Sequence, residues 1–195
     1  MKATETPAIA MRRSTRAEYD RLIEPGVFQP GERLELLDGW LVLRERQGTR
    51  HSTAIRRVLA VLRRTLGDAW QIDSQLPIAL DDLSEPEPDV SVVPGTLESY
   101  LDEHPAHPLL IVEVAASSYR IDHGYKASLY ARAAVPEYWI VDLRHETVEV
   151  HRGPEESAAA RHGWRYRGVE TLRRPARVSP LLAQDRSIAV ADLLP

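Results

Sequence analysis

The architecture of this chain follows from three short segments: EPDV at residues 87–90, LLIVEV at 109–114 and VPEYWIVD at 135–142. Asp89 and Glu113 each stand where a buried strand rich in Val, Ile and Leu would carry another aliphatic side chain. An ionised carboxylate in such a place is costly unless it has a cation, a hydrogen-bond network or exposure at a strand end. These segments therefore predict a sheet that carries a charged site.

Strands and helices alternate around these segments. The run at 109–115 is apolar on both faces except for Glu113, which is typical of a buried strand. A helix should start at Ser117 or Ser118 and end before Pro136. We also predict a helix at 53–66, a hairpin turning at Asp38-Gly39, strands at 71–80, 90–93, 138–141, 147–151, 164–169 and 187–190, and a mobile loop at 154–160. The predicted fold is α/β, with a mixed central β-sheet flanked by helices.

Length and composition bound the protein class. The 195 residues suit one domain, so we expect a flexible N-terminal arm at 1–13 and a single domain at 14–195. No apolar run approaches the roughly 18 residues that span a bilayer, which predicts a cytoplasmic protein without membrane contact. The absence of cysteine excludes disulfides and thiolate ligands, so any metal would need oxygen or imidazole ligands.

The charge balance gives no clear indication of a nucleic-acid partner. A net charge of −4 does not resemble the strongly basic surface of many DNA-binding proteins, although a local basic patch would be enough. Among the 25 lysines and arginines, only Lys2 and Lys126 are lysines. An interior lysine in an arginine-rich chain is either chance or a chemical requirement, because the two side chains are not interchangeable.

Asp89 and Glu113 are the candidate metal ligands. If both lie at neighbouring strand ends, they form an oxygen site suited to Mg²⁺ or Mn²⁺. Such a site can activate a water and neutralise charge on a phosphodiester. Asp122, Lys126 and Tyr130 follow at four-residue spacing and should share one helix face, where the lysine could orient the water. A surface ion pair between Asp122 and Lys126, worth under about 1 kcal/mol, is the open alternative.

The segments combine into a recognisable pattern. It comprises PD at 88–89, LIVEV at 110–114, SS at 117–118, D-x3-K-x3-Y at 122–130 and VPEYWIVD at 135–142. This pattern resembles the Uma2 family of bacterial proteins, which is similar to restriction endonucleases of the PD-(D/E)XK fold. LELLDG at 34–39 looks like the N-terminal hairpin of that family, and His51 with Ile55 looks like its helix start. The resemblance covers residues 15–152.

The resemblance implies roles for individual residues. Asp89 and Glu113 would be the metal carboxylates, and the backbone carbonyl of Val114 a further ligand. The usual Glu-x-Lys motif has Ala115 at its third position here, so its lysine is missing. Lys126, from the following helix, would take its place. The implied fold is restriction endonuclease-like.

Three residues are candidates for supporting roles: Glu35, His51 and Asp122. Glu35 would complete the site or pair with an arginine. His51 would assist substrate binding or proton transfer, or only cap its helix. We assign no role to His123, which points about 100° away from Asp122 on a helix. Four other histidines read as surface residues because they show no ligand spacing: His104, His107, His145 and His162.

These inferences predict a Mg²⁺-dependent (or Mn²⁺-dependent) DNA endonuclease. Two carboxylates would hold the metal that activates water, and Lys126 would assist. A homodimer is expected because a duplex offers two strands to cut. The alternative is a catalytically inactive nuclease-fold module that binds nucleic acid or protein, since a fold does not determine an activity.

Overall fold

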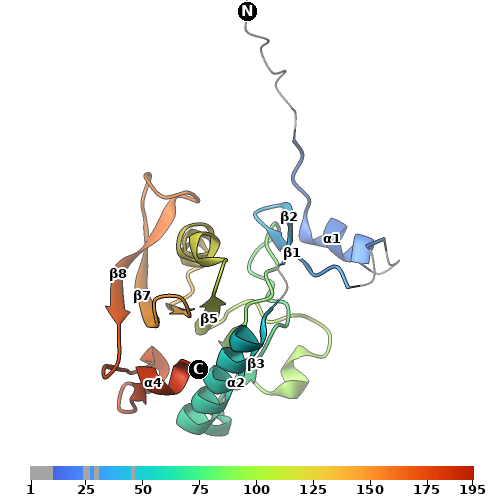
Figure 1. Cartoon of the computed structure of the whole chain (residues 1–195). Coiled ribbons are helices and arrows are strands. Elements are labelled where there is room, and N and C mark those ends of the chain that lie inside the picture. The colour runs from blue at the N-terminus through green and yellow to red at the C-terminus, as the bar shows by residue number, and fades with distance from the viewer. Residues whose placement is uncertain (1–10, 24–26, 29–30, 45–46) are drawn as a thin grey trace, which may run out of the picture.

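A six-stranded sheet forms the centre of the computed structural model, which describes residues 11–23, 27–28, 31–44 and 47–195 (Figure 1). The strand order is β3-β4-β5-β6-β7-β8. The strands are β3 (Gln71–Asp73), β4 (Val90–Val93), β5 (Leu110–Ala115), β6 (Glu137–Asp142), β7 (Thr147–Glu156) and β8 (Trp164–Leu172). Only the β5–β6 pair is parallel among these strands, so the sheet is mixed. The predicted α/β fold with a mixed central sheet is confirmed.

Helices and two small hairpins surround this sheet. The α-helices are α1 (Arg16–Ile23), α2 (Thr49–Leu66), α3 (Ala127–Arg132) and α4 (Val190–Leu193). A π-helical segment, η3 (Ile121–Lys126), leads directly into α3, and the 3-10 turns are η1 (Gly67–Ala69), η2 (Leu97–Tyr100) and η4 (Leu181–Ala183). β1 (Leu34–Leu37) pairs with β2 (Trp40–Leu43), and β9 (Arg177–Val178) pairs with β10 (Ile188–Ala189). In the described residues, no helix has both the length and the apolarity to cross a membrane.

The two faces of β5 are covered by different helices. Val112 and Val114 belong to the hydrophobic cluster that includes the apolar face of α2. Ile111 and Ala115 belong to the cluster that includes α3. Because successive side chains of a strand point to opposite faces, Glu113 lies on the α3 side. The alternation of a single strand therefore sets this carboxylate beneath the helix that carries Lys126.

α2 packs its apolar stripe against the sheet, and α4 lies beside it near the C-terminus (Figure 1). The stripe consists of Ala54, Ile55, Val58, Val61, Leu62 and Leu66. The helix begins at Thr49, earlier than predicted, because extended Gly48 rather than Ser52 or Thr53 occupies the N-cap position. One further turn therefore carries His51 within the helix.

Two further predicted boundaries were wrong. The strand predicted at 71–80 ends at Asp73, because Gln75 adopts a positive φ and the chain then bonds to neighbouring loops, as in the Ile78 N–H to Pro86 carbonyl bond. The loop predicted at 154–160 is shorter, because β7 continues to Glu156 and pairs there with Trp164 of β8. Pairing with β8 thus overrides the polar composition of residues 154–156.

The chain before the sheet packs on the β1–β2 hairpin. Most of the predicted arm, residues 1–10, lies outside the described residues. Arg13 pairs with Asp38 at 3.1 Å. Thr15 and Glu18 form the reciprocal capping bonds that start α1. The arm and the single-domain organisation stay predictions.

Replacing Gly39 by alanine is expected to lower the free energy of unfolding by more than about 1 kcal/mol. Asp38 and Gly39 have φ values of 49° and 82°, as a tight primed turn requires. An added Cβ at Gly39 would lie 2.4 Å from Cβ of Arg13, so backbone would have to shift. Urea unfolding measures the loss, and Gly31→Ala, where a Cβ meets no atom within 4 Å although φ is also positive, is the control. An equal loss in both variants would contradict the steric part of this argument.

Candidate active site

Strands β4 and β5 bring Asp89 and Glu113 together. Val90 pairs with Val112, and the same register one step earlier sets Asp89 opposite Glu113. The backbone N–H of Asp89 donates to Glu113 Oε2 at 3.2 Å, and that of Val114 donates to Asp89 Oδ2 at 2.9 Å. Both carboxylates are buried. The two residues that the sequence singles out are therefore held by the sheet itself.

Lys126 bridges this pair to the hairpin. Its Nζ lies 3.0 Å from Glu113 Oε1 and 2.9 Å from Glu35 Oε1, and all three side chains are buried. The Tyr130 hydroxyl donates to Glu113 Oε1 at 2.8 Å. Glu35 thus pairs with the lysine rather than with an arginine. The structure brings together four residues that are separated in the sequence by up to 95 positions.

Burial and the neighbouring charges have opposing effects on the pKa of Glu113 and on that of Lys126. Burial raises the pKa of Glu113 to about 7, although the Lys126 ammonium opposes this shift. Burial alone would lower the pKa of Lys126, but the carboxylates of Glu113 and Glu35 outweigh it and raise that pKa. The lysine is therefore a permanent cation and a hydrogen-bond donor near neutral pH.

Asp122 lines the same site without an ion pair to Lys126. Its Oδ2 accepts a 2.6 Å hydrogen bond from the Ser118 hydroxyl, and burial raises its pKa. The four-residue stripe assumed a regular α-helix, whereas residues 121–126 form a π-helix with i→i+5 bonding. The lysine accordingly pairs with Glu35 and Glu113 across the site.

Asp89 has a second group of polar neighbours. His51 Nε2 lies 3.1 Å from Asp89 Oδ2, although among the described residues this buried nitrogen makes no well-aligned hydrogen bond. Burial would raise the pKa of Asp89, yet His51, the Val114 N–H and Arg44 outweigh it and hold that pKa below its ordinary value. Three side chains approach Oδ1 at 3.3–3.4 Å: Arg44, Gln47 and Gln75.

Most of these side chains, though not Gln75 or Tyr130, line a cavity of about 110 Å³. This volume exceeds the roughly 30 Å³ that one water occupies in the liquid. Among the described residues, the ionisable lining comprises four carboxylates, two permanent cations and one imidazole: Glu35, Asp89, Glu113, Asp122, Arg44, Lys126 and His51. If every carboxylate is ionised and the imidazole is neutral, two negative charges remain unbalanced. In that protonation state the cavity has the charge and the oxygen donors that a divalent cation requires.

Sequence reasoning missed Arg44, Gln47 and Gln75. Arg44 directly follows β2, and its guanidinium reaches Glu87 at 2.9 Å as well as Asp89. Gln75 enters the site because the chain leaves β3 with a positive φ at that residue. No local sequence motif marks the position of Arg44 after β2 or the positive φ of Gln75. Their contacts with Asp89 become visible only when the hairpin and the loop after β3 are packed against the sheet.

Comparison with known proteins identifies the family. The model of the Uma2 family, described as "Putative restriction endonuclease", matches residues 16–191. The chain belongs to the Uma2 family. Among solved structures, this Uma2 chain is similar to a protein from Anabaena variabilis ATCC 29413, described as a putative nuclease belonging to DUF820. The two share 17% identity at a TM-score of 0.71, over 92% of this chain and 96% of that one. No match was found among curated proteins.

Two histidines of this Uma2 chain differ from expectation. The His162 side chain is only 5% exposed, because the turn after β7 folds toward the hairpin and His162 lies 3.6 Å from Asp38. His123, to which no role was assigned, lies beside Glu149 and His151 of β7, outside the cavity lining. The pairing of β7 in the sheet brings Glu149 and His151 next to His123. The helical pattern around His123 gives no sign of this contact.

Proposed function

We propose that this chain is a Mg²⁺- or Mn²⁺-dependent endonuclease that hydrolyses DNA phosphodiester bonds. The observation that carries the proposal is the pairing of Asp89 and Glu113 from adjacent strands in one cavity, with the buried Lys126 ammonium bound to Glu113. Membership of a family described as putative restriction endonucleases supports a nuclease. The Anabaena protein supports the same fold.

The donor set fits a hard divalent cation. Asp89 and Glu113 would hold it, with the Val114 carbonyl as a proposed further ligand. Their carboxylate oxygens suit Mg²⁺ or Mn²⁺, and with every carboxylate ionised the two excess negative charges of the described lining would match the charge of the ion. His51 lines the same cavity, with its Nε2 3.1 Å from Asp89 Oδ2. When bound, the metal would supply Lewis acidity and lower the pKa of water.

The surrounding residues would position the reactants. Hydrolysis adds hydroxide to phosphorus and transfers a proton to the leaving oxygen. Lys126 would donate to the attacking water or to a phosphate oxygen, and Glu35 would hold the lysine in place. Tyr130 would fix the orientation of Glu113. His51 would bind the substrate or carry a proton, and Asp122 would add to the negative field of the cavity.

The setting of this reaction is part of the proposal. We propose that the protein acts in the cytoplasm and cuts duplex DNA as a homodimer, since two symmetric sites would match two antiparallel strands. Sedimentation of the protein alone and with a short duplex tests the assembly. A monomer in both samples would contradict the dimer without affecting the proposed chemistry.

Removal of divalent cations is expected to stop cleavage. Purified protein should nick supercoiled plasmid in Mg²⁺ or Mn²⁺, lose this activity in a chelator, and regain it when metal is returned in excess, because the carboxylates alone cannot neutralise a phosphodiester. Gel electrophoresis of the plasmid measures nicking, and single-stranded DNA and RNA of equal length test substrate class. Full activity in the chelator would contradict metal dependence. DNA binding without nicking in any metal would favour the inactive binding module.

A further inference from the structure

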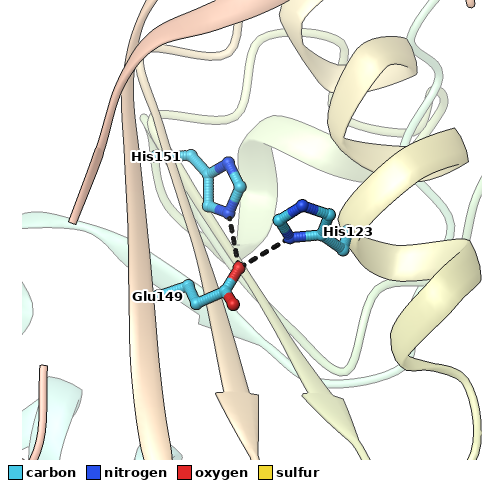
Figure 2. A group of neighbouring side chains, drawn as sticks. All are labelled: His123, Glu149 and His151. Carbon is cyan, nitrogen blue, oxygen red and sulfur yellow. Dashed lines mark hydrogen bonds and ion pairs between the residues drawn. The ribbon is translucent and has the colours of Figure 1, made fainter. Parts of the chain in front are cut away.

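A second group of potential metal ligands lies between η3 and β7 (Figure 2). Figure 2 shows Glu149 and His151 projecting from one strand toward His123 on the facing helix. His123 Nδ1 lies 2.8 Å from Glu149 Oε2, and His151 Nε2 lies 3.2 Å from the same oxygen. The candidate ligand atoms of the three residues all lie within 4.8 Å of one another. Three donors from two elements therefore converge on one point.

The three donors differ in accessibility. The His151 and Glu149 side chains are 4% and 8% exposed, whereas that of His123 is 48% exposed. His151 is held among aromatic rings, with ring centroids of Tyr138 and Tyr166 at 5.4 and 5.7 Å. Glu149 and His151 are thus held in place by the sheet, whereas the half-exposed His123 can be reached by an ion from solvent.

Glu149 is also held by a tyrosine. The Tyr119 hydroxyl donates to Glu149 Oε1 at 2.6 Å, which leaves Oε2 directed at the two imidazoles. Although burial would raise the pKa of Glu149, the hydrogen bonds from His123, His151 and Tyr119 outweigh it and lower that pKa. A carboxylate oriented by an outer hydrogen-bond donor is the usual arrangement of a metal ligand.

We propose that His123, Glu149 and His151 form a binding site for a zinc-class transition metal ion, separate from the Asp89–Glu113 site. Two imidazoles and one carboxylate suit Zn²⁺ better than Mg²⁺, and three protein ligands leave one position open. Bonds of about 2.0–2.2 Å would separate tetrahedral ligand atoms by roughly 3.4 Å. The His151 nitrogen already lies near this distance from Oε2, and the half-exposed His123, whose Nδ1 lies 2.8 Å from Oε2, would move outward to reach it.

The ion would join two elements of the fold. His123 belongs to the π-helical segment that also carries Asp122 and Lys126. Glu149 and His151 belong to β7. A bound metal would therefore fasten the helix of the candidate active site to the central sheet. This role is structural, because none of the three ligands lines the cavity.

Zinc binding by the full chain tests the proposal. The measurement is calorimetry of Zn²⁺ in Glu113→Gln protein, with Mg²⁺ present, so that the other carboxylate site does not contribute. One equivalent of Zn²⁺ should bind, and its addition should raise the Tm. His123→Ala should weaken affinity at least roughly 10-fold, the lower range for loss of even an outer-shell partner. Since His123 is half exposed, this variant should fold.

The controls distinguish this site from incidental histidine binding. His145→Ala removes a neighbouring histidine that is 58% exposed and pairs with Asp142, so Zn²⁺ affinity should not change. Glu149→Gln should weaken binding as His123→Ala does, and Co²⁺ absorption should report the same loss. No binding by the Glu113→Gln protein, unchanged affinity in His123→Ala and Glu149→Gln, or an equal loss in His145→Ala would each overturn the proposal. None of these outcomes depends on DNA cleavage.

Discussion

Replacing Lys126 by methionine is expected to lower DNA cleavage at least about 100-fold, the effect of losing one preorganised donor. It should also lower the free energy of unfolding by about 3–5 kcal/mol, because Glu35 and Glu113 would remain buried without their cation. Plasmid-nicking rates and urea unfolding measure the two effects. Methionine keeps most of the side-chain volume, so the expected losses arise from charge rather than from a cavity.

A double variant separates the catalytic effect from the stability effect. Glu35→Gln combined with Lys126→Met removes one acid together with the cation, so much of the lost stability should return. Cleavage should stay low, since the ammonium beside Glu113 is still missing. Recovery of cleavage together with stability would show that Lys126 matters only for folding, and unaltered cleavage in Lys126→Met would remove it from the site.

Glu113→Gln is expected to weaken Mn²⁺ binding and to reduce cleavage, each at least about 100-fold, because a carboxylate ligand contributes several kcal/mol to such a site. The fold should persist, because Lys126 keeps its ion pair with Glu35 and the amide can still accept the Asp89 N–H. Calorimetry with Mn²⁺ and a nicking assay on the same preparation measure both effects.

Glu155→Gln is the matched control for this substitution. Glu155 of β7 forms an ion pair with Arg165, its partner on the adjacent strand β8. The Glu155 side chain is 30% exposed. The control should bind Mn²⁺ and cleave DNA as the unmodified protein does. Wild-type Mn²⁺ affinity in Glu113→Gln would show that the metal binds elsewhere. Lost affinity with retained cleavage would separate the reaction from this metal.

The sequence predicted the parts of the site that obey strand periodicity. Asp89 and Glu113 interrupt apolar strands, so burial required a partner for each, and the pairing of β4 with β5 brings them together. The positive φ of Asp38 and Gly39 likewise follows from the DG turn. For the two acids and for the turn, a short segment of sequence is enough to explain the structure that forms.

The rest of the site depends on contacts between distant segments. Glu35 meets Lys126 because the hairpin docks over the helix, 91 positions away. The π-helical turn at 121–126 replaces the regular spacing from which a pairing of Asp122 with Lys126 was expected. His123 reaches Glu149 only because β7 pairs beside β6. These contacts join residues that are far apart in the sequence, so the periodicity of a short segment could not predict them.

The bridge from Glu35 to Lys126 has a consequence for biosynthesis. A nascent chain that ends before residue 126 holds Glu35 and Glu113 but lacks the lysine that pairs with both of them in the folded protein. These carboxylates must stay hydrated until the helix has been translated and has packed onto the sheet. The candidate site is therefore completed only after residue 126 has left the ribosome.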